Sequence, residues 1–403
     1  MNSPPGQTDA DIVIVGAGLI GTPLAHALSR QGWSVVLLDE SSAVVKNTAS
    51  GSGLAQRCTA LNLGTRRWLQ RQGLWRAIEQ DACPIEQVTV SHKGYFGATR
   101  LRAADLGVEA VGYVVNNEHM AASFVTELGS VDVRHVTNAR VESVALQENC
   151  VRVYFGDSYL DARLLIAADG VSSIVRESLG IATRKVDYEQ AAVLATVALE
   201  GKHDNIAYER FTASGPLAML PRPGRLMSFV DCVSPAEADA ISAYDDAQYL
   251  QRLQRSFGFR LGRFTDIGPR FVTSLVRIES TSQTAQRTVL LGSAMRLLHP
   301  VGGQGYNLAM RDVAQLQQLL SEHRGLSPSA DPGAAALLAE FVRQRKIDQH
   351  RTVSFTDALA RSFRGKASLP GHFRALGLIG LDTVSPLRRR FSRFTMGLGP
   401  GTY

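Results

Sequence analysis

The sequence contains little cysteine, and its cysteines are not paired. The four of them, Cys58, Cys83, Cys150 and Cys232, are far apart in a chain of 403 residues, and no two form a Cys-x-x-Cys motif. This spacing argues against a disulfide framework and against a zinc site built from cysteines. A reducing compartment fits this usage, and we expect a cytoplasmic protein.

Long apolar runs, strong charge and clustered histidines are absent as well. No run reaches the roughly 18 residues of a membrane-spanning helix, and residues 1–10 are too short and polar for a signal peptide, so we expect any membrane contact to be peripheral. The net charge of +6 is mild and its arginines are spread out, which does not indicate a nucleic-acid partner. The histidines show no metal-binding spacing, and no metal site is predicted.

Glycine, in contrast, is placed with a clear pattern near the start of the chain. Residues 11–39 read DIVIVGAGLIGTPLAHALSRQGWSVVLLD, a β-branched run, a glycine turn, a helical repeat of apolar residues and a second apolar run. This order predicts a strand–helix–strand unit of the kind that binds nucleotides, with Gly32 closing the helix.

The three glycines of this turn have distinct expected roles. Gly16 permits the tight turn, Gly18 lets the backbone approach a pyrophosphate, and Gly21 lets helix and strand pack closely. The start of the helix offers unpaired N–H groups to the phosphates. Asp39 ends the second strand, where an acidic side chain accepts hydrogen bonds from an adenosine ribose and disfavours a 2′-phosphate.

Two later segments repeat the junction of a buried strand with a glycine turn. AADGVSSIVR covers residues 167–176, and LLGSAMRLLHPVGGQGYNLAMRD covers residues 290–312, with a helix expected from 307 to about 321. Between them, residues 185–280 alternate apolar and polar positions between Pro/Gly turns, which predicts a mostly antiparallel sheet. A further helix is expected near 335–352, followed by a basic, apolar tail over 363–396.

The three junctions, in this order, resemble the class A FAD-dependent aromatic hydroxylases. The third motif, together with YERFTASGPLAMLP at 208–221 and SFGFRLGRF at 256–264, is similar to their ubiquinone-biosynthesis branch. The resemblance implies an α/β fold: a Rossmann-like FAD-binding domain of the para-hydroxybenzoate hydroxylase type (1–80, 106–180 and 281–345), an inserted, mostly antiparallel substrate domain (81–105 and 181–280), and a helical C-terminal region (346–403).

The resemblance also assigns residues to the cofactor, FAD. It implies that Asp169, Gly170 and Arg176 match the family's Asp-Gly fingerprint, and that the segment from Pro300 to Asn307 passes along the flavin ring, where backbone N–H groups at a helix start stabilise negative charge. The cofactor-binding set is Gly16, Gly18, Leu19, Ile20, Gly21, Asp39, Glu40, Arg57, Asp169, Gly170, Arg176, Gly292, Ser293, Gly302, Gly303, Gly305, Tyr306 and Asn307. The expected reaction-site residues are Pro300, His299, Gly303 and Gln304; His299 is weighed as a substrate or flavin contact against a structural hydrogen bond.

Three positions depart from the family pattern. Ser293 stands where an Asp usually binds the ribityl chain, which leads us to expect weaker retention of FAD, and Arg296 replaces the usual His three residues later. Glu118 stands where many relatives carry an arginine near the flavin, so we expect it to turn away from the pyrophosphate or to pair with a base.

The resemblance implies that NAD(P)H reduces the FAD, that O2 adds to give a C4a-hydroperoxide, and that a polyprenylated phenol is hydroxylated. It also implies a ubiquinone-biosynthesis complex and a membrane surface as partners. The basic tail is either a helix that lies in this surface, on the inner face of the membrane, or an ordinary C-terminal helix packed on the FAD domain with a solvated basic face. Three alternatives stay open: a non-catalytic lipid-binding scaffold, a flavin-dependent reductase or halogenase, and a hydroxylase of another aromatic substrate. The KxxWxWxIP pattern of tryptophan halogenases is absent.

Overall fold

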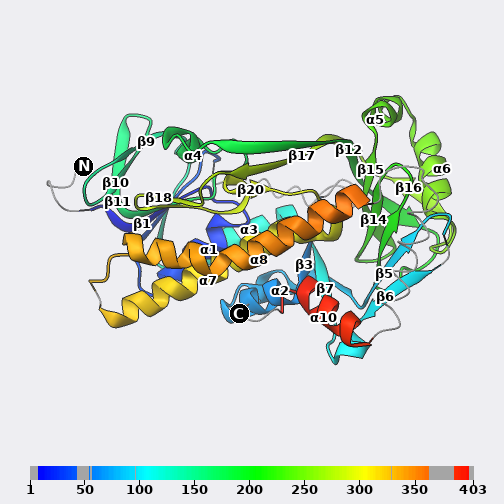
Figure 1. The fold of residues 1–403 in the computed structure, drawn as a ribbon, viewed down its shortest axis with the longest axis horizontal. Helices are drawn as coiled ribbons and strands as arrows, with labels where there is room; N and C mark the ends of the chain where they lie inside the picture. Colours follow the sequence, from blue (N-terminus) through cyan, green and yellow to red (C-terminus); the bar gives the residue numbers. More distant parts are fainter. Residues whose placement is uncertain are drawn as a thin grey trace.

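The computed structural model describes residues 8–42, 54, 57–95, 97–327, 329–362 and 385–398. Three β-sheets and a layer of long helices make up this part of the chain, with the two larger sheets at opposite ends of an elongated molecule (Figure 1).

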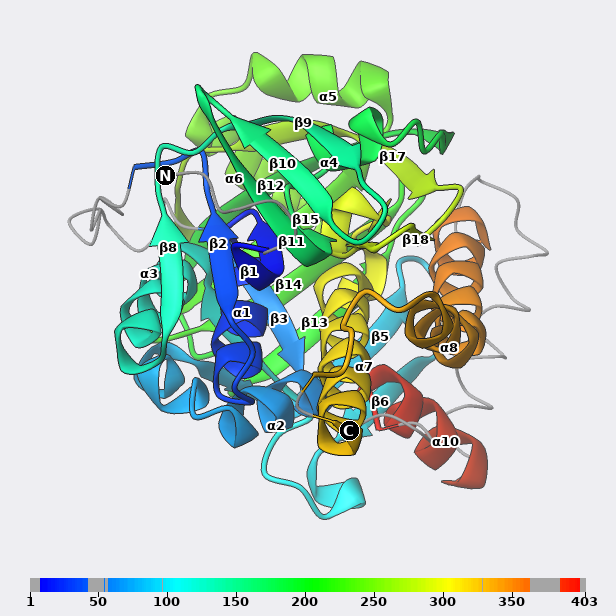
Figure 2. The same cartoon turned by 90° about the vertical axis from the view of Figure 1, so that its left-hand side faces the viewer.

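The first sheet carries the predicted nucleotide-binding unit. Its parallel strands lie in the order β19-β11-β1-β2-β8, with bounds β1 (Ala10–Val15), β2 (Val35–Leu38), β8 (Val133–Val136), β11 (Ser158–Ala167) and β19 (Thr288–Leu290). β18 (Thr284–Ala285), β10 (Val151–Phe155) and β9 (Val141–Leu146) add antiparallel pairs. Figure 2 shows these strands side by side.

Both faces of this sheet are covered, which explains its continuous apolar strands. On one face Ile12 and Ile14 pack with α1 (Gly21–Ser29), α3 (Asn117–Glu127) and α7 (Gln304–Leu326). On the other face Val13 and Val15 pack with the β9–β10 hairpin and α4 (Ile174–Ser178). The strand ends that carry the glycine turns therefore emerge between two apolar layers.

The second sheet is the predicted, mostly antiparallel one. Its strands lie in the order β20-β17-β12-β15-β14-β13-β5-β6, and β16 pairs with β12. Their bounds are β5 (Gln87–His92), β6 (Ala98–Arg102), β12 (Thr183–Leu199), β13 (Ile206–Phe211), β14 (Pro216–Arg222), β15 (Leu226–Val233), β16 (Phe264–Ile267), β17 (Phe271–Ser280) and β20 (Arg296–Leu297). β13 and β5 pair in parallel, unlike the rest.

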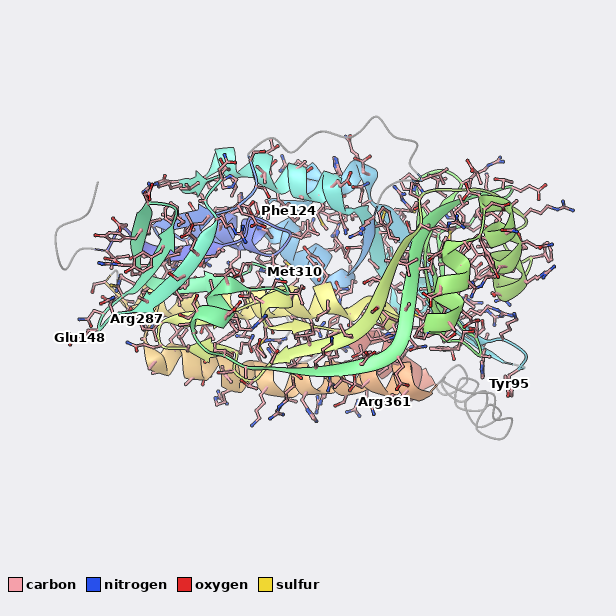
Figure 3. The ribbon with its side chains drawn as sticks, turned by 90° about the horizontal axis from the view of Figure 1, so that it is seen from above. Tyr95, Phe124, Glu148, Arg287, Met310 and Arg361 are labelled. Atoms are coloured by element: carbon pink, nitrogen blue, oxygen red, sulfur yellow. The ribbon has the colours of Figure 1, made fainter. Side chains whose placement is uncertain are left out.

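Two long strands join the ends of the molecule. β12 and β17 run from the neighbourhood of the first sheet into the second, as the view from above shows (Figure 3). A register shift between Asp187 and Ala191 bends this pair. Helices α5 (Pro235–Ser242) and α6 (Asp246–Phe257) cover the outer face of the second sheet, where Tyr249 and Leu253 join its core.

A small third sheet lies between the larger ones. It consists of β3 (Cys58–Asn62), β7 (Gly112–Asn116) and β4 (Cys83–Ile85), and α2 (Leu63–Arg71) follows β3 directly. The Asn62 side chain caps α2 by accepting the N–H of Thr65 at 2.9 Å. Short 3₁₀ turns complete the fold, among them η6 (Gly292–Ala294) and η7 (Val301–Gly303).

Some helix ends differ from the sequence prediction. The first helix ends at Ser29 with Arg30 as its C-cap, so Gly32 (φ 83°) lies two residues beyond the cap. α7 begins at Gln304, three residues earlier than expected, because the two left-handed residues Gly302 and Gly303 lead directly into it. α8 (Ala335–Ser362) continues well past 352, and α10 (Ser385–Thr395) follows as the last described helix.

Candidate functional site

The first glycine turn is shaped by two close backbone contacts. A Cβ on Gly16 (φ 102°) would lie 2.5 Å from the carbonyl oxygen of Ala168, and a Cβ on Gly21 would lie 1.9 Å from that of Gly16. Both distances are far below van der Waals contact, so only glycine fits. A Cβ on Gly18 would meet nothing within 4 Å, which leaves open space in front of the turn.

Asp39 closes the other side of this turn. One carboxylate oxygen accepts the N–H of Ala17 at 2.6 Å and the other accepts the N–H of Ser41 at 2.8 Å. The carboxylate therefore lies beside the glycine turn, as the motif predicts. Glu40 points elsewhere: its exposed side chain lies 4.0 Å from Arg140.

Asp169 follows β11 and contains a buried oxygen atom without a partner. Its Oδ2 accepts the N–H of Val175 at 3.2 Å, whereas Oδ1 is shielded from solvent and has no hydrogen-bond partner among the described residues. Burial raises the pKa of this carboxyl, although hydrogen bonds from Ser173 and Val175 oppose the shift. Gly170 (φ 88°) turns the chain directly after it. A buried polar atom of this kind needs a partner, which a bound ligand can supply.

Arg176 and the Gly292–Ser293 turn bring the second and third motifs together. The guanidinium donates to the carbonyl of Ala294 at 3.0 Å and to that of Val171 at 2.8 Å. Gly292 (φ 58°) packs against Ile20, whose Cγ1 would be 3.2 Å from an added Cβ. Arg176 thus holds two loops together.

The third motif forms the start of α7. Tyr306 donates its hydroxyl to the carbonyl of Leu19 at 3.1 Å, which ties this helix to the first glycine turn. The Asn307 amide donates to the carbonyls of Ala60 and Gly303, and its oxygen accepts from Asn62 N–H at 2.9 Å. Gly303 and Gly305 leave the approach to the helix start uncrowded, since the nearest atom to an added Cβ is 3.7 Å away at Gly303 and beyond 4 Å at Gly305.

His299 and Pro300 lie just before this helix. His299 is 1% exposed, its Nδ1 accepts the N–H of Val301 at 3.2 Å, and its ring packs edge-on against Tyr188 at 4.9 Å between centroids. These contacts favour the structural reading of His299, while Pro300 lines the cavity described next.

A cavity of about 520 Å³ adjoins the Pro300–Asn307 segment. Its walls come from the second sheet, the third sheet, the start of α7 and the facing sides of α8 and α10, and most of them are apolar. Lining side chains include Val88, Leu101, Phe211, Leu220, Phe355, Leu359, Phe391 and Met396. Pro300, Gly302, Gly303, Gln304 and Asn307 border it on the side of the third motif.

Comparison with known proteins places the chain in a family. Residues 9–352 match the family described as FAD binding domain. Ubiquinone hydroxylase UbiL of Rhodospirillum rubrum is 35% identical, over 97% of this chain and 91% of that protein. The 3-demethoxyubiquinol 3-hydroxylase of Escherichia coli is 25% identical, over 96% and 98%. The crystal structure of p-nitrophenol 4-monooxygenase PnpA from Pseudomonas putida superposes with a TM-score of 0.78 at 18% identity, over 97% and 98%.

The chain belongs to the FAD-dependent monooxygenase family. The fold predicted from the resemblance, a Rossmann-like FAD-binding domain with an inserted antiparallel sheet, is confirmed. FAD is the cofactor of this monooxygenase. The site residues carried over from the family pattern stay predictions.

The structure fits FAD at the predicted place. The open space before Gly18 and the N-terminus of α1 suit a pyrophosphate, and the unpartnered Oδ1 of Asp169 suits a hydroxyl or amide donor. Ser293 is half-buried in the η6 turn, directly after Gly292. Arg57 stands at an exposed position before β3, with its guanidinium 4.7 Å from the centre of the Phe271 ring.

The departures from the family pattern have structural partners. Arg296 extends toward the α7–α8 contact, where its Nε lies 3.5 Å from Glu279, its Nη1 lies 3.9 Å from Asp312, and its Nη2 donates to Gln349 at 3.1 Å. The arginine therefore belongs to a buried polar network between helices. Glu118 is exposed in the first turn of α3, and its expected turn away from the cofactor or pairing with a base stays a prediction.

One polar residue of the cavity was missed by the sequence prediction. Glu209, in the middle of β13, lines the cavity, and its Oε1 is buried without a partner. Gly302 of the third motif donates its backbone N–H to this carboxylate, and burial raises its pKa to about 7. The available signal was an acidic residue within an otherwise half-buried strand.

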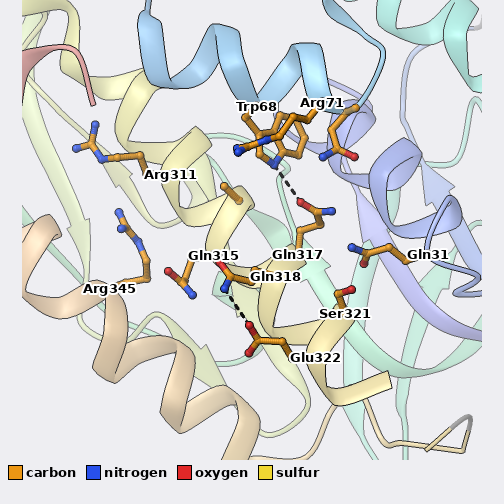
Figure 4. Close-up of a pocket in the computed structure, with 12 residues that line it drawn as sticks. Gln31, Trp68, Arg71, Arg311, Gln315, Gln317, Gln318, Ser321, Glu322 and Arg345 are labelled. Atoms are coloured by element: carbon orange, nitrogen blue, oxygen red, sulfur yellow. Dashed lines mark hydrogen bonds between the residues drawn. The ribbon is translucent and has the colours of Figure 1, made fainter. Parts of the chain in front are cut away.

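A second, polar hollow of about 300 Å³ lies farther along α7, beside residues 311–322 (Figure 4). Trp68 donates to Gln317 at 3.0 Å beside it, and Arg311 and Arg345 border it. None of the predicted cofactor residues lines it. Within the described residues there is neither a cluster of three metal-ligating side chains nor a helix suited to crossing a membrane.

Proposed function

We propose that this monooxygenase hydroxylates the ring of a polyprenylated phenol in ubiquinone biosynthesis. The reaction takes the phenol, O2, NAD(P)H and a proton, and yields the hydroxylated phenol, NAD(P)⁺ and water. The names of the two relatives, a ubiquinone hydroxylase and a 3-demethoxyubiquinol 3-hydroxylase, support this substrate class.

The observation that carries the proposal is the apolar cavity beside the third motif. Its volume of about 520 Å³ lies within the range of ordinary ligand pockets, roughly 300–1,000 Å³. Of its polar side chains, Glu209, Gln304 and Asn307 lie with Gly302 on the side of the third motif. The groups that α8 and α10 contribute are mostly apolar, among them Phe355 and Leu359, although α10 also contributes Ser392 and Thr395. A molecule with a polar ring and an apolar tail matches this division.

The chain itself supplies binding, orientation and exclusion of water. When bound, FAD provides the redox chemistry that activates O2. The N–H groups at the start of α7 offer positive potential where negative charge develops, and the apolar walls keep bulk water from the reacting ring. Tyr306 and Asn307 hold this helix start in place through their bonds to Leu19 and Ala60.

The C-terminal helix α10 forms part of the cavity wall, and its exposed arginines suggest how the enzyme meets a substrate that is insoluble in water. Residues 363–384 of the predicted basic tail lie outside the described residues. In α10, Arg389, Arg390 and Arg393 are exposed. Phe391 and Phe394 of this helix, and Met396 directly after it, face the protein: Met396 is 3% exposed, and the rings of Phe391 and Phe394 pack against Phe355.

We therefore propose that the arginines of α10 hold the cavity wall against an anionic membrane, in a peripheral position on the inner face. Each arginine near an anionic surface contributes about 1 kcal/mol. Sedimentation with phosphatidylserine vesicles tests this, with charge reversal of Arg389, Arg390 and Arg393 compared with charge reversal of the exposed Arg343 and Arg351 on α8. Loss of salt-sensitive binding in the first variant alone is expected; equal binding by both variants contradicts the proposal.

The hydroxylation proposal is tested with purified protein, FAD, NAD(P)H and a phenol carrying a short prenyl chain, under ¹⁸O2. Mass spectrometry is expected to find one labelled oxygen in the product. Ala358→Trp, at a position of α8 that borders the cavity, is expected to keep bound flavin and lose hydroxylation, whereas Arg351→Trp, at a position of the same helix that does not border the cavity, is expected to keep both.

The alternatives give different results in the same assay. A lipid-binding scaffold shows neither the spectrum of bound flavin nor quenching of flavin fluorescence. A flavin reductase oxidises NAD(P)H without placing labelled oxygen in the phenol. Hydroxylation of unprenylated phenols with equal efficiency indicates another aromatic substrate.

A further inference from the structure

Glu209 occupies an unusual place for a carboxylate. Its neighbours in register on the adjoining strands are Val90 of β5 and Ala218 of β14, and all three line the same cavity. The described residues place no lysine or arginine in ion-pair contact with it. Burying a carboxylate among apolar groups without a counter-ion costs free energy of folding, so a carboxylate at such a position indicates a functional role.

The carboxylate is held on the side of the cavity where the third motif lies. The backbone N–H of Gly302 donates to the Glu209 carboxylate. Gln304, which also lines the cavity, donates its side-chain amide to the carbonyl of Gly302 at 3.0 Å. Two buried oxygens in this corner have no hydrogen-bond partner, Oε1 of Glu209 and Oε1 of Gln304. Both oxygens are hydrogen-bond acceptors, so this part of the cavity can accept a hydrogen bond from a ligand that carries a donor.

We propose that Glu209 is the general base that accepts the proton of the substrate's phenol hydroxyl, with Gln304 orienting that hydroxyl. This inference rests on the proposed function, since it names the group that acts on the phenol. A phenol hydroxyl is the donor that the corner lacks, and its ring then lies against the apolar walls next to the turn of Pro300–Asn307.

The proton balance of this step is simple. The O–H bond of the phenol breaks, a Glu209 O–H bond forms, and the negative charge passes into the ring, which becomes more reactive toward the electrophilic oxygen derived from O2. After oxygen transfer the ring carbon loses its hydrogen as a proton to regain aromaticity, and this proton balances the one taken up when the second oxygen atom of O2 leaves as water. Glu209 then returns its proton to the phenolate oxygen, so the carboxylate is regenerated.

The surroundings of Glu209 suit this exchange near neutral pH. Burial brings the pKa of the carboxyl to about 7, and the Gly302 N–H opposes part of that shift. The buried Cys232 thiol of β15 feels the charge of Glu209: burial and the negative charges of Asp231 and Glu209 raise the pKa of this thiol, so it stays neutral. A base is most effective when its pKa is near the working pH.

The test uses Glu209→Gln in the full-length holoprotein. The matched control is Glu142→Gln, which makes the same change at an exposed carboxylate on β9. The substrate is a phenol with a short prenyl chain. We expect kcat at pH 7 to fall about 100-fold in Glu209→Gln and to stay unchanged in the control, with FAD binding equal in both. We expect kcat/KM of the wild type to level off above pH 7, and that of Glu209→Gln to keep rising toward the pKa of the phenol itself, about 10.

Binding gives an independent readout. The methyl ether of the same phenol has no proton to donate, so Glu209→Gln is expected to weaken binding of the phenol at least tenfold while leaving binding of the ether unchanged. Wild-type kcat and an unchanged pH profile in Glu209→Gln overturn the inference, as do equal losses for phenol and ether. If the wild type hydroxylates no phenol, the proposed function fails, and the phenol–ether comparison still decides whether Glu209 recognises the hydroxyl. Glu209→Asp, which keeps a carboxylate, is expected to keep the levelling of the pH profile.

Discussion

Replacing Gly21 by alanine tests whether the first glycine turn needs the close contact seen between helix and turn. The added Cβ would lie 1.9 Å from the Gly16 carbonyl oxygen and 3.3 Å from the Ile14 side chain. The first contact is to backbone, so the helix itself must move away from the turn. Overpacking of this kind costs about 1–3 kcal/mol and sometimes more, and we expect about 3 kcal/mol here.

Two further alanine variants separate crowding within the protein from crowding of the ligand. A Cβ on Gly18 meets no protein atom within 4 Å, so Gly18→Ala is expected to leave the stability of the apoprotein unchanged and to weaken FAD binding. Loss of one hydrogen bond to a charged phosphate, about 1.5–3 kcal/mol, corresponds to about a 10–100-fold weaker affinity. Gly129→Ala, also without contacts within 4 Å, is the control and should change neither property.

The assay combines thermal unfolding of the apoprotein with titration of FAD followed by fluorescence quenching. Gly21→Ala should lower both the melting temperature, by several degrees, and the affinity for FAD. The reasoning is refuted if Gly21→Ala melts and binds FAD as the wild type does, or if Gly18→Ala destabilises the apoprotein as much as Gly21→Ala.

Three further predictions concern single side chains. Asp39→Ala is expected to weaken FAD binding, because each lost charge-assisted hydrogen bond contributes about 1.5–3 kcal/mol; unchanged affinity in a fluorescence titration would assign Asp39 to the turn alone. Ser293→Asp, which restores the family residue, should tighten FAD binding by a bond of similar size, and weaker binding would show a site adapted to a neutral residue. Burial, together with Arg30, lowers the pKa of His26 below 6.5, so the unfolded chain binds a proton that the folded chain does not, and the free energy of unfolding should fall as pH drops below about 6.5. Urea unfolding at several pH values should show that the free energy of unfolding falls less between neutral and acidic pH in His26→Leu than in the wild type. An identical pH dependence in the two proteins would mean that other groups cause it.

The geometry of the polar side chains near the cofactor could be read from sequence only in part. Asp39 lies at the end of its strand beside the glycine turn, as the motif predicts, because strand, turn and helix are consecutive in the chain. Arg176 was assigned to the cofactor, yet its guanidinium bonds the carbonyls of Val171 and Ala294. Its second partner lies in another motif, and a contact between loops that far apart in sequence leaves no local pattern.

The C-terminal helix shows the same limit. Its interleaved arginines and apolar residues suggest an interfacial helix, but the pattern does not say what the apolar side contacts. Met396 is buried, and Phe391 packs against Phe355 of α8, so the protein covers that side and leaves the arginines to solvent.

The sequence by itself determined the nucleotide-binding unit, the order of the three motifs and hence the family, because glycine turns and apolar periodicity are encoded by residues close together in the chain. Only the tertiary structure decided where the apolar cavity lies and that Glu209 lines it. Its walls come from β13, the start of α7, α8 and α10, which are widely separated in sequence. The physical reason is that burial without a counter-ion, which sets the properties of Glu209, arises only when these elements pack around it.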